Sequence, residues 1–407
     1  MKILVISQNS PIPPIDATRI KVLDLLKRIC KSHEVTLIFF DQAEYESSVL
    51  EEYGVTVEEV ICIPFKPHRK IDALINIFEK TPYSFHQYGL GKKEILSHAK
   101  NTSYDLVHFD GINLAQFVSC FKADTPKVIS PNDCLSLNIS RELDLKTDLL
   151  RRVYLALQRI KFKYVEKEIY KNFQKCWVMG EVDKQALLSL NPTLDIEAIP
   201  APVDTDFYCP SLRSPDIIEK KRRKVISFLG AMDSPRNIDS LRFFLDKIWP
   251  LISNMSLIDR FNVVGSNPTP EVYTMCEVDD LINVTGTVDD IRDYVYDSQV
   301  IVCPLTYGTG RKIRVLQSMS MGKPVVTTSV GSENIPAESG VHFIVADDPL
   351  AFAQSVCSLL EDPDMAQEMG ERAREFVISN SGIEAVMGKV ELMYDSLVDR
   401  ENSLGDM

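Results

Sequence analysis

The chain has 407 residues, of which 45% are hydrophobic and 25% are charged. This composition is typical of a soluble globular protein, and the length favours two domains over one. The formal net charge is −13, and the chain has no basic stretch with interleaved aromatic residues, so nucleic acid is excluded as an expected partner.

No apolar run approaches the ~20 residues that a membrane-spanning helix needs, and the first residues lack the long apolar region of a signal peptide. The nine cysteines form no CxxC pair, and the six histidines form no HxxxH or HxH group. We therefore expect a cytoplasmic protein with free thiols, without a metal site and without another cofactor.

The first part of the chain alternates apolar strands with amphipathic helices. Lys2 to Ser7 predicts a strand, Thr18 to Lys31 a helix, and Glu34 to Phe40 the next strand. Between the first strand and this helix, Asp16 or Thr18 is expected to cap the helix, and Arg19 could reach a cleft. Further strands are expected at Gly54 to Phe65, Asp105 to Phe109, Lys127 to Ser130 and Cys176 to Met179, and a helix from about Asn113.

The longest helical pattern covers residues 146–175. Its apolar residues are placed on one side of the helix, and Arg and Lys residues occupy the others. Such a helix either contacts anionic lipid head groups at a membrane surface or crosses between strands with a solvated basic face. The sequence favours the crossover helix.

The second half begins after a stretch rich in proline and charge, which predicts a linker over residues 206–223. Lys224 to Leu229 predicts a strand that leads through Gly230 into a helix carrying Arg236. Phe261 to Gly265 and Asn283 to Val288 predict two more strands.

Residues 299–331 read as a strand, a glycine turn, a helix and a second strand. Gly308 and Gly310 let the backbone approach a ligand, and the free N–H groups of the following helical turn favour an anion. Arg311, Lys312 and Arg314 add fixed positive charge in a half that is otherwise acidic, with 19 basic and 31 acidic residues from Asp206 onward. Together these features favour phosphate binding over a solvated basic turn.

At these residues the sequence resembles the family 4 glycosyltransferases that use sugar nucleotides, in the branch whose motif reads PLxxGxGTRxKxLEAMAxGKPVVxTxxGxE. The resemblance implies the α/β GT-B fold, with two doubly wound Rossmann-like domains facing each other across a cleft. It places an acceptor domain at 1–205, a linker at 206–223 and a donor domain at 224–381, with a final helix at 382–400 that packs back on the first domain.

The resemblance also implies roles for individual residues. Arg236, Arg311 and Lys312 would stabilise the departing phosphate. The donor would be bound by Gly230, Thr287, Val288, Gly308, Thr309, Gly310, Arg314, Gln317 and Glu333. The acceptor side would hold Asp16, Arg19, Asn132 and Asp133, although turn chemistry explains Asn132 and Asp133 about equally well.

Among the positions that depart from the family pattern, three lie at expected donor or acceptor contacts. Gln317 stands where the family has the Glu that holds the ribose, Thr309 where it has the Glu that contacts the donor sugar, and Asn132 where it often has His. A glutamine can still accept a hydrogen bond from a ribose hydroxyl, with less strength than a carboxylate.

The function implied is metal-independent transfer of a sugar, with retention, from a nucleoside diphosphate sugar to a hydroxyl acceptor. That acceptor would be a sugar, a lipid-linked sugar or another glycoconjugate, in polysaccharide or glycoconjugate biosynthesis. One alternative is a non-catalytic GT-B subunit that binds a nucleotide or a partner. Another is a hydrolase or epimerase of sugar nucleotides, which would need extra His and carboxylate pairs that the sequence does not show.

Overall fold

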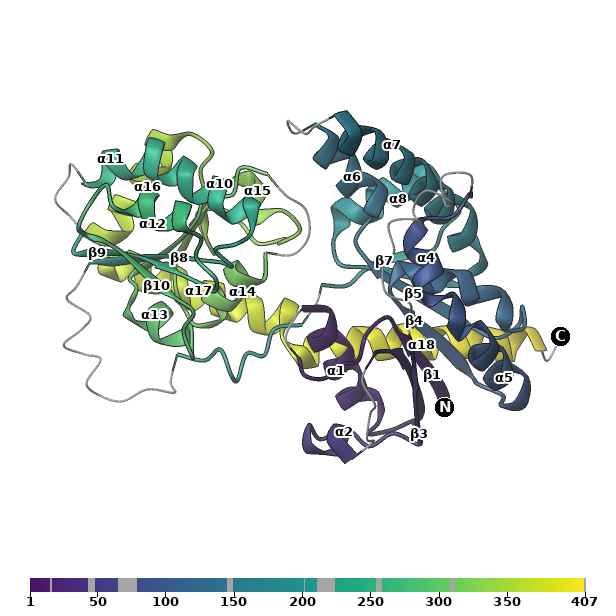
Figure 1. The fold of residues 1–407 in the computed structure, drawn as a ribbon. Coiled ribbons are helices and arrows are strands. Elements are labelled where there is room, and N and C mark those ends of the chain that lie inside the picture. The colour runs from purple at the N-terminus through teal and green to yellow at the C-terminus, as the bar shows by residue number, and fades with distance from the viewer. Residues whose placement is uncertain are drawn as a thin grey trace. The chain divides into compact units, whose positions relative to one another are not determined.

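The computed structural model describes residues 1–14, 17–42, 48–64, 79–144, 149–200, 202–210, 224–253, 258–307 and 312–405. The chain divides into two compact units, drawn in Figure 1. Unit 1 comprises Met1–Pro202 and Val386–Met407, and unit 2 comprises Val203–Ala385. Most of the expected linker lies outside the described residues.

Unit 1 is built on a parallel sheet whose described strands have the order β3-β2-β1-β4-β5-β6-β7. The strands are β1 (Lys2–Ser7), β2 (Glu34–Phe40), β3 (Glu59–Ile63), β4 (Leu106–Asp110), β5 (Lys127–Asn132), β6 (Lys175–Val178) and β7 (Ile196–Ala198). Strands such as β1 and β2 read as near-continuous apolar runs because a parallel sheet is covered on both faces.

Helices connect these strands. They are α1 (Ala17–Ile29), α2 (Ser48–Glu52), α4 (Tyr83–Tyr88), α5 (Lys92–Asn101), α6 (Leu135–Leu143), α7 (Leu149–Tyr164) and α8 (Glu181–Leu190). The helix expected from Asn113 is instead a 3₁₀ segment, η3 (Ile112–Cys120). Beyond α7 the chain continues through a π-helical turn, η4 (Val165–Ile169), and a 3₁₀ turn, η5 (Tyr170–Asn172). The short 3₁₀ turn η2 (Gly89–Gly91) joins α4 to α5.

The last helix of the chain, α18 (Ile383–Gly405), packs against unit 1 from Val386 onward. Arg28 of α1 donates to Glu391 at 2.7 Å, and the Tyr394 hydroxyl lies 2.8 Å from His108 Nδ1 in β4. Val386 and Val390 are fully buried. Unit 1 therefore includes a helix that lies nearly two hundred residues after its last strand in the sequence.

Unit 2 repeats the same plan with a parallel sheet of order β10-β9-β8-β11-β12-β13 among its described strands. The strands are β8 (Val225–Leu229), β9 (Arg260–Val264), β10 (Ile282–Gly286), β11 (Val300–Cys303), β12 (Val325–Thr327) and β13 (Ile344–Val345). The helices are α10 (Pro235–Phe243), η6 (Phe244–Ile248), α11 (Trp249–Ser253), α12 (Pro270–Cys276), α13 (Arg292–Asp297), α14 (Ile313–Ser320), α15 (Ser329–Ser332), α16 (Pro349–Glu361) and α17 (Pro363–Ser381).

Alternation along the strands of unit 2 divides its core between the two faces of the sheet. Val300 and Val302 of β11 pack with Phe244 and Phe352 on one face, whereas Ile301 packs with residues of α14 and α17 on the other. Successive side chains of a strand point to opposite faces, so one short apolar strand serves two helical layers.

Gly265, at the end of β9, is required by a close approach of two backbones. A Cβ atom at this position would lie 1.5 Å from the carbonyl oxygen of Gly230. We expect Gly265→Ala to lower the free energy of unfolding of unit 2 by about 3 kcal/mol, because the backbone after β8 must shift. Urea unfolding followed by circular dichroism would measure this. Gly388→Ala is the control, since no heavy atom lies within 4 Å of its Cβ position; an equal loss in both variants would contradict the explanation.

Among the helices in the described parts of the chain, none combines the length and the apolar content needed to cross a membrane. All nine cysteines lie in the described residues, and none of them forms a disulfide bond.

Candidate functional site

The described residues predicted to bind the donor lie mainly at one edge of the unit 2 sheet, where its parallel strands end. Gly230 follows β8, Thr287 and Val288 follow β10, Lys312 precedes α14, and Glu333 follows α15 after β12. The strand order reverses between β8 and β11. In open α/β sheets, ligands bind at the carboxyl ends of the strands beside such a reversal.

Four of the predicted residues lie outside the described residues: Gly308, Thr309, Gly310 and Arg311. Both flanks of this segment are anchored at the edge. The Tyr307 hydroxyl donates to Asp239 Oδ2 of α10 at 2.8 Å. Burial, together with the bond to Asp239 and its charge, raises the pKa of Tyr307 to about 12, so this hydroxyl keeps its proton. Lys312 is the N-cap residue of α14.

Arg236 and Lys312 are brought together around Cys303, the last residue of β11. Burial raises the pKa of the Cys303 thiol to about 11, and the Thr327 hydroxyl and the charges of Lys312 and Arg236 act in the opposite direction. The charges of both cations therefore act on the same thiol, at the carboxyl end of β11. Lys312 is only 5% exposed. An anion bound at this edge would interact favourably with both charges.

The turn that carries Arg236 is held by short-range contacts. Asn237 Nδ2 donates to the Ala231 carbonyl at 2.9 Å. A side chain on Gly230 would collide with that amide, since its Cβ would lie 2.7 Å from Asn237 Nδ2. Asn267 Nδ2 also donates to Asp233 at 3.1 Å. These contacts fix the first turn of α10, where free N–H groups favour an anion.

Arg314 and Gln317 lie one turn apart on α14 and bond to each other. Arg314 Nη1 donates to Gln317 Oε1 at 2.9 Å. Gln317 is 8% exposed, whereas Arg314 is exposed. The Arg314 charge also acts on Tyr208, whose pKa is nevertheless raised because burial dominates. The amide predicted to hold a ribose is therefore aligned by a neighbouring guanidinium group.

The remaining donor residues occupy the loops of the same edge. Glu333 directly follows α15, whose first turn is closed by Gly331 N–H donating to the Thr328 hydroxyl at 3.1 Å. A Cβ on Gly331 would lie 2.1 Å from Thr327 Oγ1, so the helix can pack there only with glycine. Thr287 Oγ1 accepts a long hydrogen bond of 3.4 Å from Asn267 N–H.

In unit 1, two of the predicted acceptor-side residues, Asn132 and Asp133, lie at the carboxyl end of β5. Asn132 ends β5 in the left-handed region with φ of 74°. Asp133 Oδ2 accepts from Asn138 Nδ2 of α6 at 3.5 Å. Arg19 of α1 reaches the Ile12 carbonyl at 3.5 Å, and Asp16 lies outside the described residues.

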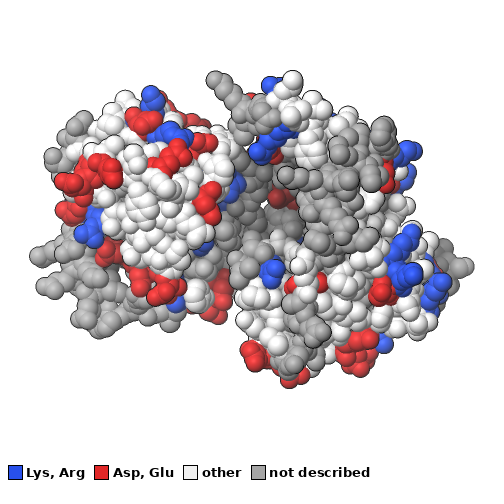
Figure 2. Space-filling model, viewed as in Figure 1, with Lys and Arg blue, Asp and Glu red and all other residues white. Residues whose placement is uncertain are grey.

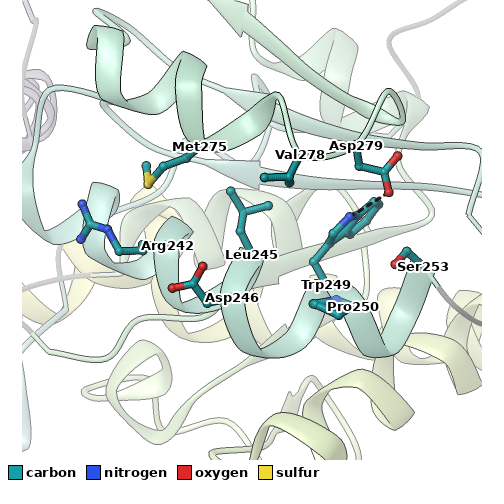
Figure 3. A pocket seen from close by; sticks show the side chains of 9 residues that line it. All are labelled: Arg242, Leu245, Asp246, Trp249, Pro250, Ser253, Met275, Val278 and Asp279. Carbon is teal, nitrogen blue, oxygen red and sulfur yellow. Dashed lines mark hydrogen bonds between the residues drawn. The ribbon is translucent and has the colours of Figure 1, made fainter.

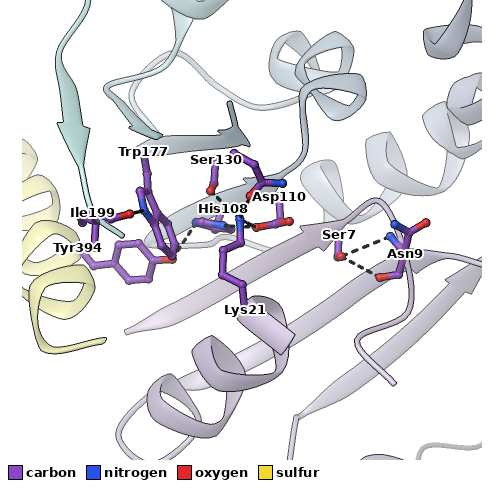
Figure 4. A network of polar contacts seen from close by, with 10 residues as sticks. Ser7, Asn9, Lys21, His108, Asp110, Ser130, Trp177, Ile199 and Tyr394 are labelled. Carbon is purple, nitrogen blue, oxygen red and sulfur yellow. Dashed lines mark hydrogen bonds and ion pairs between the residues drawn. The ribbon is translucent and has the colours of Figure 1, made fainter. Parts of the chain in front are cut away.

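A buried polar cluster lies beneath Asn132, and the sequence did not predict it. Lys21 of α1 is fully buried and pairs with Asp110 of β4, which is equally buried. Its ammonium group also donates to Ser130 Oγ at 2.9 Å and to Asn132 Oδ1 at 2.5 Å, and lies 4.9 Å from the centre of the Trp177 ring. Figure 4 shows these groups converging from separate elements. Lys21 thus fixes the side chain that stands in place of the family histidine.

His108 extends this cluster towards α18. Burial lowers its pKa, although Asp110 acts in the opposite direction, so the ring is neutral. Tyr394 is fully buried, and burial raises its pKa well above the usual value, so its hydroxyl stays protonated and forms a hydrogen bond with His108 Nδ1 (Figure 4). One sign was available in the sequence: His108 and Asp110 alternate on a buried strand and therefore share a face.

Glu166, in the π-helical turn after α7, is a second buried carboxyl group that the sequence did not predict. It is fully buried, and Oε1 accepts from Ser136 N–H in the first turn of α6 at 3.0 Å. Burial raises the pKa of Glu166 to about 6. Hydrogen bonds from Ser136 and neighbouring groups lower this pKa, but burial has the larger effect. Glu166 therefore supports the helix that follows Asp133.

The raised pKa of Glu166 makes its contribution to stability depend on pH. The native pKa lies above the unfolded one, so the contribution is complete below the unfolded pKa of about 4.3 and is lost as pH rises through about 6. We compare the unfolding free energy of Glu166→Gln with that of the wild type at each pH. This difference should shift in favour of the variant by about 2 kcal/mol as pH rises from 4 to 7.5. Urea unfolding at several pH values measures this, with the exposed Glu58→Gln as control. A difference that does not change with pH would contradict it.

Two cavities of unit 2 contain none of the predicted residues. One of about 580 Å³ lies among α10, η6, α11 and the segment after α12, over Leu245, Trp249 and Met275 (Figure 3). Three of its polar side chains are already engaged: Trp249 Nε1 donates to Asp279 at 3.1 Å, and Arg242 pairs with Asp239 and Glu271. The other, of about 490 Å³, is lined by residues such as Lys323, Pro324 and Arg374. Within the described residues, no group of three His, Cys, Asp or Glu residues could hold a metal ion.

Known proteins resemble this chain along most of its length. Residues 223–362 match the family model of glycosyl transferases group 1. A protein described as "Uncharacterized 44.6 kDa protein in cps region", from Klebsiella pneumoniae, is 20% identical over 405 residues, which cover 96% of this chain and 98% of that protein.

Solved structures are similar over almost the whole chain. Sucrose-phosphate synthase from Thermosynechococcus elongatus has a TM-score of 0.70 at 16% identity and covers 98% of this chain and 100% of its own. Anabaena Alr3699/HepE, solved with UDP and glucose, has a TM-score of 0.60 at 16% identity and covers 97% and 100%.

Two doubly wound α/β units and these structural similarities define the GT-B fold, as the sequence predicted. The resemblance to sugar-nucleotide-dependent glycosyltransferases is confirmed over residues 223–362, which match the family model of glycosyl transferases group 1.

Proposed function

We propose that the chain transfers a sugar from a nucleoside diphosphate sugar to a hydroxyl acceptor in polysaccharide or glycoconjugate biosynthesis. The observation that carries this proposal is the position of Arg236 and Lys312 around Cys303, at the carboxyl edge of the unit 2 sheet. The cps region named for the Klebsiella relative, and the UDP and glucose bound to HepE, fit such a reaction.

The proposed chemistry breaks the bond between the anomeric carbon and the phosphate oxygen, and the electron pair leaves with the phosphate. Arg236, Lys312 and the N-terminal amides of α10 would stabilise the charge that develops there, without a metal ion. Arg311 is proposed to add a third cation. Gly230, Gly308, Thr309, Gly310, Arg314, Gln317, Glu333 and the backbone at Thr287 and Val288 would bind the rest of the donor.

For transfer with retention, the acceptor oxygen bonds to the anomeric carbon on the face that the phosphate leaves, and the phosphate accepts the hydroxyl proton. No protein base is then needed at Asn132, whose amide oxygen already accepts from Lys21. Arg19, Asp16, Asn132 and Asp133 are proposed to face the acceptor, which would be a sugar, a lipid-linked sugar or another glycoconjugate. A cytoplasmic location follows from the use of a nucleotide donor and remains part of the proposal.

A non-catalytic nucleotide-binding subunit is the second candidate. It is favoured by the hydrogen bonds that already occupy Gln317 and Asn132. A thermal-shift screen of UDP, GDP, TDP and ADP identifies the nucleotide, since a ligand at 100 times its dissociation constant stabilises by about 2.7 kcal/mol.

Turnover of the corresponding nucleotide sugars, with and without hydroxyl acceptors, then separates the two candidates. Release of the nucleoside diphosphate supports the transferase. Nucleotide binding without any release would support the subunit. The membrane contact weighed above for residues 146–175 is a separate question, because it does not depend on sugar transfer.

A further inference from the structure

Helix α7 of unit 1 exposes a row of large apolar side chains. Leu149, Leu150, Val153 and Ile160 are 76%, 83%, 54% and 63% exposed, and Tyr164 is 39% exposed. At about 100° per residue these five side chains fall within an arc of roughly 100°, so they form one continuous strip, named here the apolar strip. The sequence placed most of these residues on one apolar side of a crossover helix, but the structure leaves that side uncovered.

The buried face of the same helix is a different one. Leu155, Gln158 and Phe162 are buried, and Phe162 packs in the core of unit 1. These three residues lie at least about 80° around the helix from the apolar strip, whereas the fourth buried residue of α7, Lys161, lies about 20° beyond Leu150. The apolar strip therefore lies outside the hydrophobic core, and folding of unit 1 does not require it to be apolar.

Positive charge borders the apolar strip. Arg152, Arg159 and Lys163 share the arc of α7 between the strip and the buried face. The sequence of α7, LLRRVYLALQRIKFKY, contains five Arg or Lys residues and no Asp or Glu. The whole chain, in contrast, has a net charge of −13. Lys and Arg side chains are visible on this end of unit 1 in Figure 2.

We propose that the apolar strip and its bordering cations bind the surface of an anionic lipid bilayer. A helix with exposed leucines on one face and only cations beside them matches the interfacial helices that lie in the head-group region. The exposed Tyr154 and Tyr164 suit that region, because a phenol ring is apolar with a polar tip. A second copy of the chain fits less well, since a symmetric contact through the strip would bring the cations of both helices together.

A bilayer at this surface has one consequence for the acceptor. The lipid-linked sugar, one of the acceptor classes proposed above, would be presented at such a surface. This consequence rests on the proposed function, whereas the membrane contact itself does not.

The test measures binding of the full chain to vesicles by co-sedimentation, without any donor or acceptor. Vesicles of phosphatidylcholine alone are compared with vesicles that contain about 30 mol % phosphatidylglycerol, at low and high salt. The apolar variant carries Leu149→Gln, Leu150→Gln and Val153→Gln. The charge variant carries Arg152→Gln, Arg159→Gln and Lys163→Gln.

Two matched controls lie elsewhere on unit 1. The apolar control carries Leu90→Gln and Leu392→Gln, two residues that are 45% and 71% exposed. The charge control carries Lys93→Gln and Lys100→Gln, which are exposed on α5. Unchanged Trp177 fluorescence shows that unit 1 remains folded, since this side chain is fully buried.

We expect the wild type to bind the anionic vesicles at least about 10-fold more tightly than the neutral ones, with weaker binding at high salt. Both α7 variants should bind the anionic vesicles at least about 10-fold more weakly than the wild type. Both controls should bind like the wild type. Absence of binding by the wild type, or equal binding by the apolar variant, would overturn the proposal. Self-association that the apolar variant abolishes, without vesicle binding, would instead assign the strip to a second copy of the chain.

Discussion

Arg236→Ala and Lys312→Ala should each lower kcat/KM for sugar transfer by about 10²–10³-fold, which corresponds to about 3–4 kcal/mol of transition-state stabilisation. The reason is that both cations lie beside Cys303 at the carboxyl end of β11, where the departing phosphate is proposed to develop its charge. Steady-state kinetics with the donor found in the nucleotide screen would measure the loss.

The control for these variants is Arg260→Ala. Arg260 is exposed and begins β9, so it lies at the opposite edge of the same sheet. Its replacement should leave kcat/KM within about 3-fold of the wild type. In the double variant Arg236→Ala/Lys312→Ala, the fold-loss of kcat/KM should be smaller than the product of the two single fold-losses. The reason is that both cations would act on one phosphate. Single variants with nearly normal kcat/KM would refute their role.

Lys21→Met should lower the free energy of unfolding of unit 1 by about 3–5 kcal/mol, because Asp110 would remain buried without its cation. Burial by itself raises the pKa of Asp110, but Lys21 and His108 outweigh it, and the net pKa is lowered. The pair therefore contributes stability above the unfolded pKa of Asp, and this contribution is lost as pH falls through the lower folded pKa. The effect of Lys21→Met should accordingly shrink in strong acid.

Trp177 offers a local reporter for this measurement, because its ring lies 4.9 Å from Lys21 Nζ. The chain has only two tryptophans, so a Trp249→Phe background isolates the signal of unit 1. Lys27→Met, exposed on the same helix, should change the unfolding free energy by less than about 0.5 kcal/mol. Adding Asp110→Asn to Lys21→Met should recover much of the loss. Equal stabilities of Lys21→Met and Lys27→Met would show that the buried pair does not stabilise unit 1.

The sequence predicted the architecture well for a physical reason. Strands covered on both faces, such as β2 and β11, appear as short apolar runs bounded by turn residues. The order of strand, glycine turn and helix then placed Arg236 and Lys312 at strand ends, and the structure brings both close to Cys303. Local patterns were sufficient here because each residue is positioned by the strand that precedes it.

The buried cluster of unit 1 could not be predicted in this way. Lys21, Asp110 and Tyr394 are far apart in the sequence and meet only after the sheet has formed and α18 has packed on it. A lysine in an amphipathic helix normally indicates a solvated position, so nothing local showed that Lys21 is fully buried. The opposite error occurred at Leu149 and Ile160, where apolar periodicity suggested packing that the structure does not contain.

Hydrogen–deuterium exchange with and without the nucleoside diphosphate that stabilises the chain tests the site most directly. If the pyrophosphate is held at the carboxyl edge of the unit 2 sheet, amide protection should increase in the peptides that cover 229–237, 303–317 and 327–333. Bound nucleotide that leaves these three segments unchanged, and protects other parts of the chain instead, would contradict the site.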